Sequence, residues 1–172
     1  MKRILLIGCL ISSLFFFSCD VKNSGNTKSH ESEIKNESEI VQNVFEELMY
    51  CFEVKDSQRL INLFSETIRE RTNLEDEINQ SFDFFQGKMI SYNKLSNDIY
   101  QSHNNMGNYE YKSLRITAEN VSTKVENYEV TIYYVIIDEK YSSNIGISMV
   151  LIENSDDYCT IGENISVTDD ER

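Results

Sequence analysis

Proton-transfer chemistry in this chain would have to rest on carboxylates. The two histidines, His30 and His103, fall in a polar N-terminal segment and in an Asn-rich loop, away from the expected strands. A carboxylate exchanges protons near neutral pH only if burial or a neighbouring charge shifts its pKa. The carboxylates that we consider are Asp83, Glu110, Glu119 and Glu129. Each lies in a pattern that more simply places it on a solvent-facing side, so we predict no catalytic residue and no enzyme activity.

Patterns that bind metals, phosphates or cofactors do not occur in the sequence. No cysteine has the CxxC or CxxH spacing of a zinc site. The six glycines form no phosphate-binding loop, and no serine or cysteine has a histidine partner in a recognisable frame. We therefore predict neither a metal nor another cofactor.

Tyrosines on or beside the expected strands are the best candidates for binding. A tyrosine combines a large apolar ring with a hydroxyl that needs a hydrogen-bond partner, which suits a ligand pocket or a protein interface. We select Tyr92, Tyr111 and Tyr133 as residues that line a pocket. Packing within a sheet is the alternative for each of them.

Helices are expected in the first half of the chain. Between residues 37 and 54, apolar side chains recur with the spacing of one helical face. Asp56 is a suitable N-cap for a second helix. The spacing of Thr72 and Glu75 predicts a capping box that opens a third helix, which ends at Gly87.

After Gly87 the apolar period changes from about 3.6 residues to 2, which indicates strands. The expected strands are 88–96, 109–119, 126–137, 145–152 and 158–161. Helices followed by successive strands predict an α+β domain rather than a parallel α/β one.

The N-terminus has the pattern of a secretory signal. Lys2 and Arg3 precede an apolar run, 4–17, that ends at Ser18 and Cys19. The run is shorter than the roughly 20 residues that a membrane-spanning helix needs. It resembles the lipobox of bacterial lipoproteins, which implies cleavage before Cys19, lipidation of that cysteine and anchoring in a membrane of the bacterial cell envelope. An ordinary cleaved secretory peptide and an uncleaved anchor are the alternatives.

The remaining boundaries follow from composition. We predict a signal peptide at 1–18, a flexible tether at 19–36, one domain at 37–167 and an acidic tail at 168–172. The net charge of the chain is −13, and removal of the two basic residues in 1–18 makes it −15. This charge repels nucleic acids, so we expect no nucleic-acid partner.

Two cysteines, Cys51 and Cys159, lie within the expected domain. In an oxidising compartment they could form a disulfide, which in the chain-entropy model contributes up to ~4.7 kcal/mol for a loop of about a hundred residues. The alternative is a pair of thiols that act as small apolar side chains. The sequence leaves both alternatives open.

Four segments carry a family resemblance: FDFFQGKMISY, YEYKSLRITAENV, YEVTIYYVII and NIGISMVLI. They are similar to a family of small bacterial lipoproteins known only as a domain of unknown function. The resemblance implies a fold like that of cystatin and nuclear transport factor 2, in which N-terminal helices pack on a curved antiparallel sheet of four to five strands. It also implies a pocket between the concave sheet and a long helix. Because the expected sheet carries no titratable pair, we predict an anchored, non-catalytic domain that binds a small ligand or a protein partner. The resemblance adds a homodimer as a further expectation. The alternatives are a self-protection (immunity or inhibitor) lipoprotein and an isomerase or dehydratase of the same fold.

Overall fold

The computed structural model describes residues 27–103 and 109–165, with only the backbone described at 27–36 and at His103. Four helices come first: α1 (Thr27–Val54), α2 (Ser57–Leu63), α3 (Glu66–Arg69) and α4 (Leu74–Phe84). They are followed by β1 (Lys94–His103), β2 (Glu110–Ser122), β3 (Asn127–Asp138), the short 3-10 helix η1 (Ser142–Asn144), β4 (Gly146–Glu153) and β5 (Tyr158–Gly162). The strands form one antiparallel sheet in the order β1-β2-β3-β4-β5. This arrangement confirms the predicted α+β fold.

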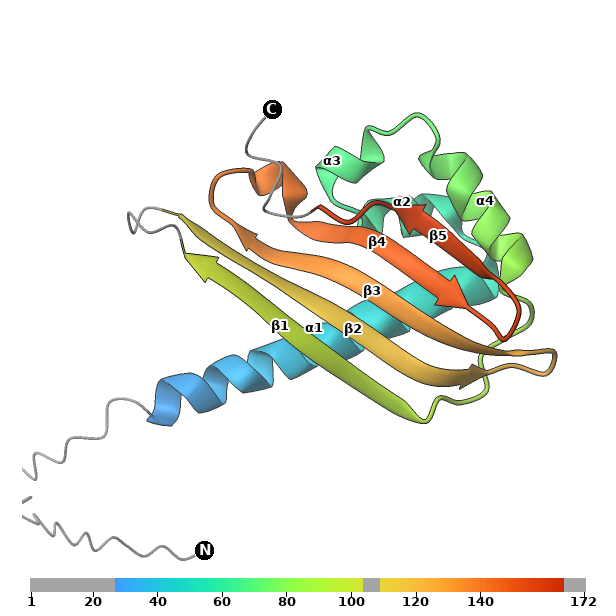
Figure 1. Cartoon of the computed structure of the whole chain (residues 1–172), viewed down its shortest axis with the longest axis horizontal. Coiled ribbons are helices and arrows are strands. Elements are labelled where there is room, and N and C mark those ends of the chain that lie inside the picture. The colour runs from blue at the N-terminus through green and yellow to red at the C-terminus, as the bar shows by residue number, and fades with distance from the viewer. Residues whose placement is uncertain (1–26, 104–108, 166–172) are drawn as a thin grey trace, which may run out of the picture.

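Helix α1 supports one face of the sheet. It crosses behind the strands in Figure 1, while α2, α3 and α4 gather beside β4 and β5. Its apolar face is buried at Val41, Phe45, Leu48 and Phe52, which belong to one core cluster with the inward-facing side chains of the strands. The helical period in the sequence predicted this face correctly.

The start of α1 differs from the prediction. The helix begins at Thr27, within the segment 19–36 that we expected to be a flexible tether. Lysine and glutamate, which recur between Thr27 and residue 36, favour the helix, and a helix already formed over the core extends without a new nucleation step. Residues 19–26 lie outside the described part of the chain.

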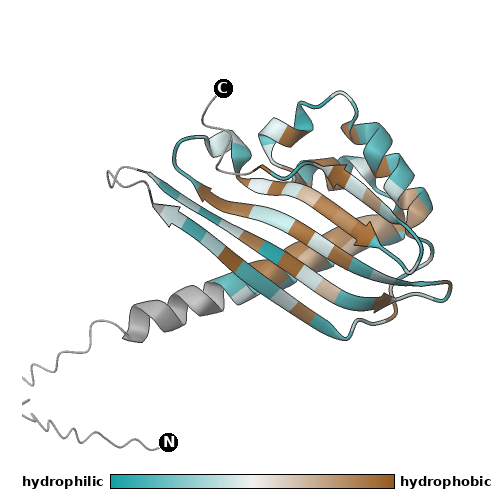
Figure 2. Cartoon of the chain, viewed as in Figure 1, coloured by the Kyte–Doolittle hydropathy of each residue, from teal (hydrophilic) through white to brown (hydrophobic). Residues whose placement is uncertain are grey.

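Alternation along the strands gives the sheet two different faces. In β2, Leu114, Ile116 and Ala118 are buried in the core cluster, whereas Arg115 between them is exposed. Figure 2 shows this as bands of hydrophobic and hydrophilic residues along β1 and β2. We call the side of β1, β2 and β3 that is turned away from α1 the open face.

Two predicted boundaries are wrong. The first strand spans Lys94–His103 rather than 88–96, because its pairing partner β2 fixes the register in which Lys94 faces Glu119. The polar segment 94–103, whose apolar alternation is weak, therefore forms a strand because it pairs with β2. The capping box is also wrong: α4 has Asn73 as its N-cap, and Asn73 makes no side-chain capping hydrogen bond. Asp56 does cap α2, where it accepts a hydrogen bond from the Arg59 backbone N–H at 2.9 Å.

Candidate functional site

A pocket of about 540 Å³ lies on the open face, between the first three strands and the segment that follows β5. Its lining comprises Asp98, Ile99, Tyr100, Tyr111, Ser113, Leu114, Arg115, Tyr133, Asn164 and Ile165. Most of these residues come from neighbouring positions of three adjacent strands, so the sheet itself forms the floor of the pocket.

The strand register brings the lining residues together. Arg115 of β2 is paired with Asp98 of β1 on one side and with Tyr133 of β3 on the other. Two residues further along these strands, and so on the same face of the sheet, Tyr100 of β1 is paired with Ser113 of β2. Facing residues of an antiparallel sheet project to the same side, so these side chains form a continuous patch.

The position of the pocket corrects the prediction that it lies between the sheet and the long helix. That space is filled by core side chains, including Phe45 and Leu48, which are 0% exposed. Arg115 alternates with Leu114 and Ile116, both buried in that core, so Arg115 and its register partners Asp98 and Tyr133 project away from α1. Leu114 belongs to the core and also borders the pocket. Close packing of the helix against the sheet leaves the opposite face as the place where a ligand can enter.

Tyr111 lies at the inner edge of the pocket. It is buried, and its hydroxyl donates a hydrogen bond to the Ile165 carbonyl oxygen at 3.2 Å. Its ring meets that of Tyr100 edge to face, with centroids 6.1 Å apart. Burial, more than the nearby charge of Asp138, raises the pKa of Tyr111, so its hydroxyl stays protonated and holds the segment after β5 beside the sheet.

The structure places two of the three selected tyrosines in the pocket. Tyr133 is half-buried there, together with Tyr111. Tyr92 is elsewhere: its ring packs edge to face on Phe45 at 5.0 Å, and its hydroxyl accepts a hydrogen bond from the Gln42 amide at 3.4 Å. Tyr92 therefore does not line this pocket, because it lies before β1 and packs against Phe45 of α1.

The charged lining residues, Asp98 and Arg115, were not selected from the sequence. Both are exposed, and neither side chain has an ion-pair or hydrogen-bond partner within the described residues. Arg115 is the only arginine between residues 72 and 171, which is the signal that could have drawn attention to it. Asp98 fell outside the predicted strands, so its proximity to Arg115 was not foreseeable.

The carboxylates considered for catalysis do not line the pocket. Asp83 and Glu129 are exposed, Glu119 lies 3.6 Å from Lys94, and Glu110 accepts a hydrogen bond from Gln101 at 3.0 Å. Among the side chains that the structure describes, no group of three or more potential metal ligands occurs.

Asp138 is a buried carboxylate that the sequence did not single out. It accepts hydrogen bonds from the Tyr109 hydroxyl at 3.0 Å, from the Tyr141 backbone N–H at 2.8 Å and from the Asn144 amide at 2.8 Å. Its oxygens are thus occupied in shaping the turn between β3 and β4. This role is structural.

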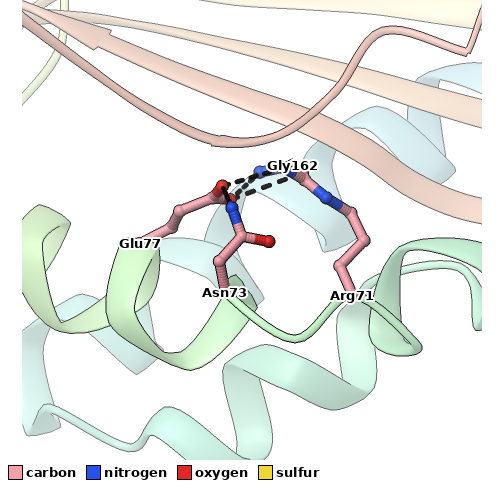
Figure 3. A network of polar contacts seen from close by, with 4 residues as sticks. All are labelled: Arg71, Asn73, Glu77 and Gly162. Atoms are coloured by element: carbon pink, nitrogen blue, oxygen red, sulfur yellow. Dashed lines mark hydrogen bonds and ion pairs between the residues drawn. The ribbon is translucent and has the colours of Figure 1, made fainter.

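A second polar network fixes the end of β5. The Glu77 carboxylate of α4 accepts hydrogen bonds from Arg71 at 2.9 Å, from the Asn73 amide at 2.6 Å and from the Gly162 backbone N–H at 2.8 Å (Figure 3). The segment that begins at Gly162 continues to Asn164 and Ile165 in the pocket wall. The helical layer therefore positions one side of the site.

Both cysteines of the domain are free thiols in the structure. Cys51 is fully buried in α1 and Cys159 is half-buried in β5. Burial raises the pKa of the Cys51 thiol from 9.0 to about 11, so its stabilising contribution is complete below pH 9 and is lost as the pH rises toward 11.

We expect Cys51 to resist alkylation in the folded protein. At pH 8 the raised pKa alone lowers its thiolate fraction about 100-fold, and burial slows access further. Iodoacetamide labelling of a Cys159→Ser variant, read by peptide mass spectrometry, should be slow without urea and fast in urea. Rapid labelling of the folded variant would contradict this expectation. The unmodified chain tests for a disulfide between Cys51 and Cys159. If neither cysteine is labelled in urea until a reductant is added, the two are bonded.

The fold and the pocket define a small α+β domain with an open-face binding site. The family described as Domain of unknown function (DUF5104) matches residues 47–160, and the chain belongs to this family. A comparison with curated proteins finds no match. Of the helices that the structure describes, none is both long enough and apolar enough to cross a membrane.

Proposed function

We propose that this chain is a bacterial envelope lipoprotein, anchored through Cys19, whose domain binds a small ligand without chemically changing it. The pocket on the open face is the observation that carries the proposal. Its volume falls within the roughly 300–1,000 Å³ typical of small-molecule sites, and aromatic rings with a few polar groups are typical linings. The long helix packed on an antiparallel sheet also supports a cystatin-like or nuclear-transport-factor-2-like class of fold.

The chemistry of the lining favours binding over catalysis. Among the described lining residues Asp98 is the one carboxylate, and it is exposed rather than enclosed with a second titratable acid or base. General acid–base catalysis usually needs a group whose pKa has been tuned by burial or by a close neighbour. Arg115 and the tyrosines are suited instead to hold a ligand.

The anchor is tested by the chemistry of Cys19. A diacylated chain holds a protein stably at a membrane, because two acyl chains contribute far more than one. The mature N-terminal peptide should carry the mass of a diacylglyceryl cysteine, and a Cys19→Ala variant should leave the membrane fraction. An unmodified mature N-terminus would refute the anchor.

The binding role is tested by a fragment screen on the purified protein, read by ligand-detected NMR. We expect fragments that bind the unmodified chain and are lost in a Tyr133→Ala variant. A Tyr50→Ala variant is the matched control, since Tyr50 is an exposed aromatic residue on α1 outside the pocket. The absence of any Tyr133-dependent fragment, or chemical turnover of a bound one, would contradict the proposal.

A further inference from the structure

The pocket floor carries two opposite charges side by side. Asp98 and Arg115 are register partners on β1 and β2, and their side chains project to the open face. Facing residues of an antiparallel pair have Cβ atoms about 4.5–5.5 Å apart, so both charges lie within reach of one small molecule. Neither side chain is paired within the described residues, with each other or with a neighbour.

The row of side chains continues with an aromatic ring. Asp98 of β1 is the register partner of Arg115 of β2, which in turn is the register partner of Tyr133 of β3. The three side chains therefore form one row across the strands. The ring of Tyr100 and the side chain of Ile165 border the same pocket. A ligand above this row meets a negative charge, a positive charge and apolar surface in sequence.

The adjacent charges of Asp98 and Arg115 favour a ligand that carries both a negative and a positive group over a ligand with one charge. An anion held by Arg115 would be repelled by Asp98, and a cation held by Asp98 would be repelled by Arg115. A molecule with both a carboxylate and an ammonium group satisfies both, because the guanidinium binds a carboxylate through paired hydrogen bonds and the aspartate accepts from the ammonium.

We propose that the pocket recognises zwitterions with an apolar side chain, namely free amino acids or short peptides. The carboxylate binds Arg115, the ammonium binds Asp98, and the side chain lies against Tyr133 and Tyr100. Tyr111 contributes its ring, since its hydroxyl is engaged by the Ile165 carbonyl. This inference rests on the proposed binding function and narrows its ligand class.

The test uses three probes that differ in charge: L-phenylalanine, N-acetyl-L-phenylalanine, which lacks the ammonium, and L-phenylalaninamide, which lacks the carboxylate. Isothermal titration calorimetry on the purified protein should show that either modification weakens binding by at least about tenfold. In an Asp98→Asn variant, acetylation should no longer matter. In an Arg115→Gln variant, amidation should no longer matter.

A Lys94→Gln variant is the matched control. Lys94 faces Glu119 on the same two strands and lies outside the pocket, so its loss should leave all three affinities unchanged. If Asp98 and Arg115 had only structural roles, each substitution would weaken the binding of all three probes equally. Acetylation and amidation would then still lower the affinity of each variant.

The outcomes separate this inference from the proposed function. Equal binding of the three probes by the unmodified chain overturns the zwitterion inference. So does a lack of binding by phenylalanine, leucine and the dipeptide Phe-Leu. If fragments still bind through Tyr133, the binding function stands and only the ligand class is wrong; if none does, both fail.

Discussion

Replacing Lys112 by methionine is expected to lower the free energy of unfolding by about 3–5 kcal/mol. Lys112 of β2 and Glu37 of α1 form an ion pair between sheet and helix, and they are only 6% and 8% exposed. Methionine keeps most of the side-chain volume but leaves the Glu37 carboxylate buried without this partner. An uncompensated buried charge costs far more than the net contribution of the pair. Urea unfolding followed by circular dichroism measures the change.

Two controls make this prediction specific. A Lys94→Met variant breaks the exposed pair with Glu119, whose side chains are 63% and 47% exposed, and should cost less than about 1 kcal/mol. A double variant, Lys112→Met with Glu37→Leu, removes both buried charges and should recover most of the lost stability. A single Lys112→Met variant as stable as the unmodified chain would show that Glu37 of α1 does not pack against Lys112 of the sheet in solution.

Replacing Gly162 by alanine is expected to cost about 2–5 kcal/mol, the sum of backbone strain and overpacking. Gly162 has φ +80, a left-handed conformation that suits glycine, and an added Cβ would lie less than 3.0 Å from the Ser148 carbonyl oxygen. The displaced atom is backbone, so it cannot move aside as a flexible side chain could. Because Glu77 also binds the Gly162 N–H, the shift should loosen the contact between α4 and β5.

Gly87 provides a matched comparison. Its φ is +89, but an added Cβ would meet only side chains, those of Thr123 at 3.3 Å and Val125 at 3.6 Å, and no backbone atom among its nearest neighbours. Gly87→Ala should therefore cost only the backbone term, about 1–2 kcal/mol. Thermal or urea unfolding that ranks the two variants equally would contradict the close approach at Gly162.

Much of the fold could be predicted from the sequence because the core residues recur with two clear periods, about 3.6 residues in the helices and 2 in the strands. The helical stripe that includes Phe45 and Phe52 and the alternation around Ile116 are strong local signals. The start of α1 and the position of β1 carry no such signal. They depend on packing and strand pairing, which local propensity does not encode.

The site was less predictable for the same reason. Tyr111 and Tyr133 were selected by residue type and strand location, and both line the pocket. Their side of the sheet was wrongly predicted, because the sequence does not specify which face α1 covers. The pairing of Asp98 with Arg115 requires the register of two strands, and the contribution of Ile165 requires the path of the chain after β5.

We infer that this domain binds its ligand on the open face of the sheet and not on the side that α1 covers. The most direct measurement is a titration of the isotope-labelled protein with L-phenylalanine, followed through backbone amide resonances. The chemical-shift changes should cluster at residues 98–100, 113–115 and 133, and the resonances of α1 should stay unchanged. Tyr50 and Arg59 line a separate pocket formed by residues of α1 and α2. Shifts concentrated there, or no shifts with any apolar zwitterion or fragment, would contradict binding at the open face.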